Sequence, residues 1–162
     1  MQRCTCLRGK LIATAFLSIV LHAQTLQIQI QATDGQNGTA AIQLTSPDGQ
    51  QPLALQWELS FPDSVQIESA GATISEPSGN AGKSIRCAIL PNRAGKTQTC
   101  RCLVAGGTNR VPNGGVAVLK YSAARPLRPG RYSLDLKKGL AVTSDLKKLA
   151  MKDVRAEIVL AK

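Results

Sequence analysis

The chain has 162 residues, with 20 Lys and Arg against 10 Asp and Glu, which gives a formal net charge of +10. Its one histidine is His22, inside an apolar N-terminal segment, so the rest of the chain has no imidazole. This excludes Ser-His-Asp and Cys-His nucleophiles and histidine-based zinc or copper sites. Glycoside hydrolysis by a pair of carboxylates remains chemically possible. A typical sugar-binding cleft, however, has more aromatic side chains than the four found beyond the N-terminal segment. We therefore expect no enzyme and no cofactor. The four aromatic residues are Trp57, Phe61, Tyr121 and Tyr132.

The N-terminus has the features of a secretory signal peptide. Arg3, Arg8 and Lys10 precede a short apolar run at residues 11–21, and we expect cleavage after Ala23. The run is short of the about 20 apolar residues that a membrane span needs. We predict a signal peptide at 1–23, one domain at 24–162, no membrane span after cleavage, and a secreted, extracellular or periplasmic location. An uncleaved anchor is the alternative.

The charges are distributed unevenly along the remaining chain. Residues 24–82 contain six acids and no Lys or Arg, whereas residues 83–162 contain seventeen bases and four acids. The bases occur singly or in pairs with few aromatic residues between them, so nucleic-acid binding is disfavoured. An acidic partner, a polyanionic surface and charge pairing within the fold are all compatible with this pattern.

The segment from Leu53 to Phe61 alternates between large apolar residues at odd positions and small or polar residues at even positions. A strict period of two predicts a strand with one buried and one exposed face. Trp57 and Phe61 share the apolar face, so we assign both to the core. Pro62-Asp63-Ser64 ends the strand.

The remaining segments predict short strands separated by turns, without a convincing helix. The turn at Asp34–Gly38 contains oxygen ligands but lacks the spacing of a calcium-binding loop, so we predict no metal site. We expect a flexible connection at 75–82 and a single helical turn at 146–151. About nine strands argue for an all-β, two-sheet sandwich. They lie near residues 26–31, 40–44, 53–61, 65–67, 85–89, 100–104, 116–121, 132–136 and 154–160, with a short piece at 140–142.

Three cysteines follow the signal segment, and an oxidising compartment favours a disulfide between two of them. Residues 91–96 look like a hairpin tip, and counting back symmetrically from this tip places Cys87 opposite Cys100. Directly opposed residues of an antiparallel pair lie close enough to bridge. We predict a Cys87–Cys100 disulfide with Cys102 as a free, buried thiol. A shift of two residues would pair Cys87 with Cys102 instead.

Three stretches of this chain resemble a cohesin module: residues 53–72 (LALQWELSFPDSVQIESAGA), the hairpin formed by 83–90 and 97–107, and residues 113–136 (NGGVAVLKYSAARPLRPGRYSLDL). The resemblance implies a β-sandwich of jelly-roll type and a non-catalytic binding role. Cohesins bind dockerins, small calcium-loaded helical modules, and so assemble extracellular polysaccharide-degrading complexes. A dockerin-like protein is accordingly one expected partner, and a polysaccharide is the other.

The resemblance also suggests where a partner binds. Cohesins use the outward face of the strand that matches Leu53 to Phe61, so we expect Gln56, Glu58 and Ser60 to contact the partner, free of any role in the core. A carbohydrate-binding module is an alternative, and it would need an exposed row of aromatic side chains. A structural or adhesive envelope domain without a small ligand is the third possibility.

Overall fold

The computed structural model describes residues 24–32, 36–62, 64–91, 97–123 and 126–160. The expected signal peptide and part of the Asp34–Gly38 turn lie outside these residues. The described elements are ten strands and one short helix. They are β1 (Thr25–Ala32), β2 (Asn37–Thr45), β3 (Ala54–Pro62), β4 (Val65–Ile74), α1 (Glu76–Asn80), β5 (Ser84–Leu90), β6 (Thr97–Ala105), β7 (Gly114–Ala123), β8 (Gly130–Val142), β9 (Lys148–Ala150) and β10 (Val154–Leu160).

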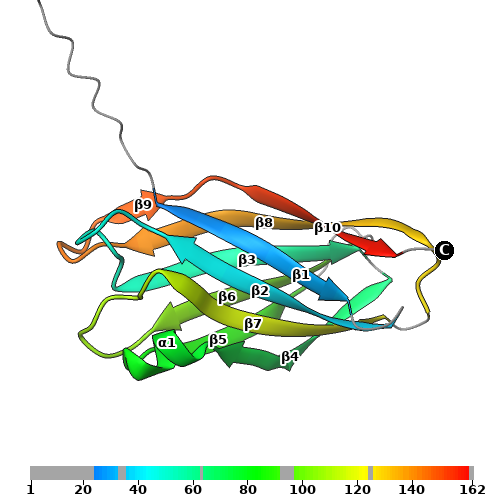
Figure 1. The fold of residues 1–162 in the computed structure, drawn as a ribbon, viewed down its shortest axis with the longest axis horizontal. Coiled ribbons are helices and arrows are strands. Elements are labelled where there is room, and N and C mark those ends of the chain that lie inside the picture. Colours follow the sequence, from blue (N-terminus) through cyan, green and yellow to red (C-terminus); the bar gives the residue numbers. More distant parts are fainter. Residues whose placement is uncertain (1–23, 33–35, 63, 92–96, 124–125, 161–162) are drawn as a thin grey trace, which may run out of the picture.

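The strands form two antiparallel sheets that pack face to face (Figure 1). One sheet has the order β1-β2-β7-β4, and the other has the order β10-β8-β3-β6-β5, with β9 added beside β8. Strand β3 is therefore central in the second sheet, between β8 and β6. The predicted all-β, two-sheet sandwich is confirmed.

The core lies between the sheets, and β3 is its main contributor. Leu55, Trp57, Leu59 and Phe61 are fully buried, as their alternation predicts. The Phe61 ring meets the ring of Tyr121 from β7 in the opposite sheet, with a distance of 5.7 Å between the centroids. Apolar side chains from both sheets thus close one continuous core, which the burial of apolar area stabilises.

Helix α1 forms where we expected a flexible connection. Its turn is closed by hydrogen bonds from Gly79 N to Ser75 O (2.8 Å) and from Ala81 N to Pro77 O (3.2 Å). Ser78 is buried and its hydroxyl donates to Gly115 O of β7 at 3.3 Å. The prediction was wrong because this contact with β7 supports a five-residue helix that its own composition would not.

The expected helical turn at 146–151 is also wrong, because residues 148–150 form strand β9 on the end of β8. The register joins Leu140 with Ala150 and Val142 with Lys148. The short piece at 140–142 is thus the last part of one long strand, β8. Residues 148–150 have no strong preference for a helix or a strand, and pairing with β8 supplies hydrogen-bond partners for their backbone groups.

The disulfide joins Cys87 to Cys102, with 4.1 Å between the Cα atoms, so the predicted Cys87–Cys100 pairing is wrong and the two-residue shift is correct. The β5–β6 ladder ends at Leu90 opposite Thr99, which places Cys87 opposite Cys102. Strand β6 begins at Thr97, two residues before its pairing with β5 begins, because its first residues pair with β3 on the other side. The symmetric count failed for this reason. The free, buried thiol is Cys100 rather than Cys102.

Candidate partner-binding face

The outward side of the β3 sheet gathers the residues that we expected to contact a partner. Gln56, Glu58 and Ser60 lie opposite Leu103, Arg101 and Thr99 of β6. Strand β8 lies on the other side of β3, with Lys137 opposite Glu58 and Asp135 opposite Ser60. We call this surface the β3 face. It comprises Gln56, Glu58, Ser60, Thr99, Arg101, Leu103, Asp135, Lys137, Lys138 and Arg155.

Glu58 is at the centre of the β3 face, and its carboxylate is held in ion pairs within the sheet. The residue is 6% exposed. Its Oε1 accepts hydrogen bonds from Arg101 Nε at 3.1 Å and Nη2 at 2.6 Å. Its Oε2 lies 3.0 Å from Lys138 Nζ. Burial alone would raise the pKa of Glu58, but the hydrogen bonds and charges of Arg101 and Lys138 outweigh it and lower the pKa. A partner therefore meets Glu58 only through these two cations.

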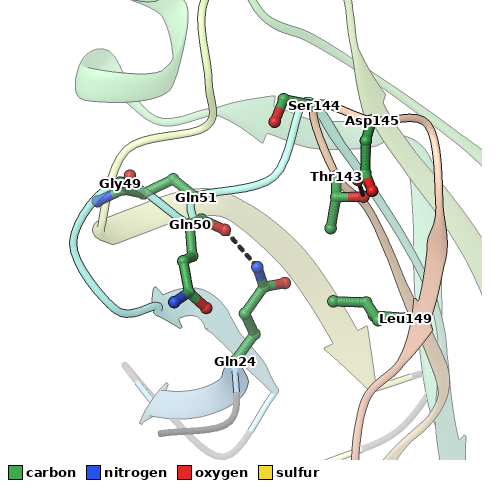
Figure 2. Close-up of a pocket in the computed structure, with 8 residues that line it drawn as sticks. All are labelled: Gln24, Gly49, Gln50, Gln51, Thr143, Ser144, Asp145 and Leu149. Carbon is green, nitrogen blue, oxygen red and sulfur yellow. Dashed lines mark hydrogen bonds between the residues drawn. The ribbon is translucent and has the colours of Figure 1, made fainter.

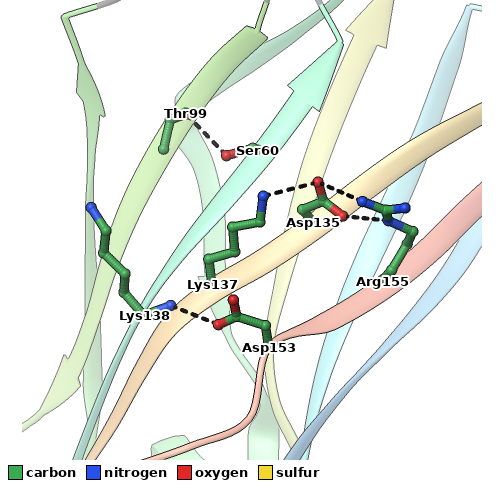
Figure 3. Close-up of polar contacts among 7 residues, drawn as sticks. All are labelled: Ser60, Thr99, Asp135, Lys137, Lys138, Asp153 and Arg155. Atoms are coloured by element: carbon green, nitrogen blue, oxygen red, sulfur yellow. Dashed lines mark hydrogen bonds and ion pairs between the residues drawn. The ribbon is translucent and has the colours of Figure 1, made fainter.

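A second charged group on the β3 face is built around Asp135 (Figure 3). Arg155 of β10 donates from Nε to Asp135 Oδ1 at 2.7 Å, and Lys137 Nζ lies 3.3 Å from Oδ2. The hydrogen bond from Arg155 is the main reason why the pKa of Asp135 is lowered. Beside this group, the Ser60 and Thr99 hydroxyls are 3.0 Å apart, so Ser60 already has a partner within the sheet.

The acids and the cations of the β3 face differ in exposure. The side chains of Glu58 and Asp135 are only 8% and 22% exposed. The cations that bind them are 47% (Arg101), 48% (Lys137), 66% (Arg155) and 70% (Lys138) exposed. Long basic side chains thus cover short acidic ones, and N–H donors of the cations face the solvent. Leu103 is 45% exposed among them. The surface that a partner meets is positive with one apolar residue.

The contribution of Lys138 depends on an irregularity in β8. Its φ of 51° lies in the left-handed region, and the β3–β8 register shifts between Gln56 and Glu58. This bulge lets the adjacent residues Lys137 and Lys138 both reach acids of the same face, which regular alternation forbids. The Lys138 amide also donates to Asp153 Oδ1 at 3.2 Å (Figure 3). Sequence reasoning missed Lys138, although Lys137-Lys138-Gly139 interrupts the alternation of β8 and signals a bulge.

A small pocket of about 200 Å³ lies away from the β3 face, at one end of the sandwich (Figure 2). The Gln24 side-chain amide donates to Gln50 O across it. Asp145 on the opposite wall accepts hydrogen bonds from Lys147 and from Thr143 Oγ1, and these bonds hold the pKa of Asp145 at about 2. The Gln24 amide nitrogen and the Asp145 carboxylate are thus already engaged, whereas the buried Gln24 Oε1 has no hydrogen-bond partner among the described residues. It is lined by Gln24, Gly49, Gln50, Gln51, Thr143, Ser144, Asp145 and Leu149.

The aromatic side chains do not form a sugar-binding platform. Trp57, Phe61 and Tyr121 are buried. Tyr132 is half-buried, and its hydroxyl donates to Arg128 O at 2.9 Å. Among the described residues, no helix is long and apolar enough to cross a membrane.

Comparison with models of protein families and with curated proteins finds no match to this sequence. Comparison with solved structures finds cohesins. A cohesin module from a family 33 glycoside hydrolase of Clostridium perfringens superposes with a TM-score of 0.65 at 12% identity, over 85% of this chain and 96% of that one. A non-cellulosomal cohesin from Archaeoglobus fulgidus gives a TM-score of 0.52 at 12% identity, over 84% of this chain and 92% of that one.

A type I cohesin in a cohesin–dockerin complex from Clostridium thermocellum gives a TM-score of 0.53 at 10% identity, over 83% of this chain and 98% of that one. The protein is therefore a two-sheet β-sandwich with a cohesin-like fold. The resemblance first seen in three stretches of sequence extends to the arrangement of the strands in space.

Proposed function

We propose that this protein is a secreted, non-catalytic cohesin-like module that binds a protein partner of dockerin type through the β3 face. The observation that carries the proposal is the combination of a cohesin-like fold with an open, charged sheet face. One of the similar structures is a cohesin in complex with a dockerin. The signal-like segment at 1–23 and the disulfide support secretion.

The chemistry of the β3 face indicates what the partner supplies. In each ion pair of the β3 face, the cation is more exposed than the acid. These cations are Arg101, Lys137, Lys138 and Arg155. Partner carboxylates would add to these pairs without removing Glu58 or Asp135 from their cations. Complementary charge raises the association rate and specificity, and salt screens it. We therefore expect partner capture to weaken as the salt concentration rises.

The proposal is tested by affinity capture from the native secretome with the folded mature domain, once with calcium and once with a chelator. Calcium-dependent capture of a protein that carries a dockerin-type repeat is the expected result. Capture of insoluble polysaccharide alone would instead assign the protein to the carbohydrate-binding modules. Capture of nothing would favour a structural envelope domain.

Two matched variants locate the binding surface. Leu103→Asp places a carboxylate on the β3 face, and Leu149→Asp makes the same change at an equally exposed leucine on β9, beside the end pocket (45% and 44% exposed). We expect Leu103→Asp to reduce capture about tenfold or more, as hot-spot changes do, and Leu149→Asp to leave it unchanged. Equal capture by both variants would remove the β3 face from the proposal.

A further inference from the structure

The sulfur atoms of Cys87, Cys100 and Cys102 gather behind the β3 face, all within 4.8 Å of one another. Cys87 and Cys102 are bonded, and the Cys100 Sγ lies 3.8 Å from the Cys102 Sγ. Cys100 and Cys102 are both fully buried on the inner side of β6. A free thiol in contact with a disulfide has the two reactants of thiol–disulfide exchange already side by side.

We propose that these three cysteines form an exchange site, in which Cys100 attacks the Cys87–Cys102 bond and the protein interconverts between two disulfide pairings. As β5 slips along β6, the Cys100 thiolate, whose sulfur already lies within 4.8 Å of the Cys87 Sγ, attacks that atom. A Cys87–Cys100 bond forms, the Cys87–Cys102 bond breaks, and Cys102 leaves as a thiolate. Cys102 then takes up one proton, which replaces the proton that Cys100 lost. The numbers of disulfides and thiols stay the same, so no oxidant or reductant is consumed.

The position of β5 permits the second pairing. Cys100 is now a diagonal neighbour of Cys87, and diagonal Cα atoms are about 7–8 Å apart, which is too far for a disulfide. A slip of two residues along β6 would bring Cys87 opposite Cys100 and keep every side chain on its present face. Strand β5 is at the edge of its sheet and pairs with β6 alone among the described strands. Within the part of the chain that the structure describes, the slip therefore breaks no ladder other than β5–β6.

The charges of the β3 face favour the pairing that the structure contains. In the present register, Ala88 lies opposite Arg101, which binds Glu58. After the slip, Arg86 would stand opposite Arg101, and directly opposed like charges destabilise a sheet. The Cys87–Cys102 form is thus the ground state, and the Cys87–Cys100 form carries a rearranged β5–β6 edge. Burial raises the pKa of Cys100, so the exchange should be slow near neutral pH and faster in alkali.

Disulfide mapping tests the proposal directly, because Arg101 lies between Cys100 and Cys102 and trypsin separates them. The folded protein is incubated at about pH 7 and about pH 9, quenched with acid, alkylated and digested. Peptide 87–93 linked to 102–110 reports the first pairing, and the same peptide linked to 97–101 reports the second. We expect the second pairing to appear roughly 100-fold faster at the higher pH, following the thiolate fraction.

Two variants complete the test. Cys100→Ser should keep the first pairing at every pH. Cys102→Ser should oxidise to a Cys87–Cys100 disulfide while retaining its strand circular dichroism. The proposal is overturned if the native wild-type protein keeps one pairing at about pH 9 while a urea-unfolded sample shuffles. A folded Cys102→Ser protein that stays a dithiol after oxidation would overturn it as well. If Cys102→Ser does not fold, the wild-type measurement decides alone.

Discussion

The Lys138 ammonium lies 3.0 Å from the Glu58 carboxylate, and this ion pair joins a bulge of β8 to the centre of β3. On the other side of Glu58, Arg101 of β6 contributes two hydrogen bonds. One nearly buried carboxylate thus ties three adjacent strands together on the outer face. Around Glu58, the same arrangement presents the two cations rather than the carboxylate to a partner.

Replacing the central carboxylate should weaken the fold measurably. Glu58→Gln removes the charge that receives Arg101 and Lys138, and hydrogen bonds to charged groups contribute about 1.5–3 kcal/mol. Both cations are substantially exposed and regain water, so we expect a loss at the low end, about 1–2 kcal/mol in the free energy of unfolding. Urea denaturation measures it. The control is Glu157→Gln, whose ion pair with Arg131 is exposed and should contribute less than about 0.5 kcal/mol.

The lowered pKa values of Glu58 and Asp135 predict acid sensitivity. A carboxyl with a lower pKa in the folded state than in the unfolded state contributes stability above its unfolded pKa, and this stability is lost as the pH falls through the folded pKa. The usual values are 4.5 for Glu58 and 3.8 for Asp135. The free energy of unfolding should therefore decline as the pH falls below about 4.5. The double variant Glu58→Gln/Asp135→Asn should show a shallower decline in the same titration, and an unchanged slope would contradict the assignment.

A glycine of β2 is required by the tyrosine behind it. A Cβ at Gly38 would overlap Tyr121 Oη and would lie 2.7 Å from the backbone oxygen of Gln31. The buried Tyr121 ring cannot withdraw without losing its contact with Phe61. Gly38→Ala should destabilise the protein by about 1–3 kcal/mol, as overpacking does. Gly79→Ala in α1 is the comparison, since its Cβ would meet only Ile74 at 3.6 Å. That change should be neutral or stabilising in thermal unfolding.

The buried Lys83 side chain joins two loops by hydrogen bonds to their backbone carbonyl groups. It is 5% exposed, and its Nζ donates to Leu53 O at 2.9 Å and to Gly106 O at 2.5 Å. Lys83→Met keeps most of the side-chain volume but leaves both carbonyl oxygens without this donor, so we expect a loss of about 1–3 kcal/mol. Lys120→Met, at an exposed position of β7, removes the same charge and should change the unfolding free energy by less than about 0.5 kcal/mol. Equal effects in denaturant titrations would contradict the role of Lys83.

Much of the fold was predictable because alternation is a local property. The period of two in 53–61 identifies the buried row of β3, and the same signal locates the other long strands. The predictions were wrong where the conformation of a segment depends on a neighbouring element. Helix α1 depends on its contact with β7, and β9 depends on the end of β8. The disulfide was misassigned because the first residues of β6, from Thr97, pair with β3 alone. The pairing of β6 with β5 begins only at Thr99.

The candidate site divides in the same way. The alternation of the sequence is enough to place Gln56, Glu58 and Ser60 on the outward side of β3, because side-chain direction in a strand follows residue parity. The covering of Glu58 by Arg101 and Lys138 follows from the folded arrangement alone. These residues come from strands far apart in the chain, and the position of Lys138 depends on a bulge. Alternation is encoded residue by residue. Register, bulges and ion pairs across strands arise only when the strands meet, because they depend on distances between segments that the linear order does not specify.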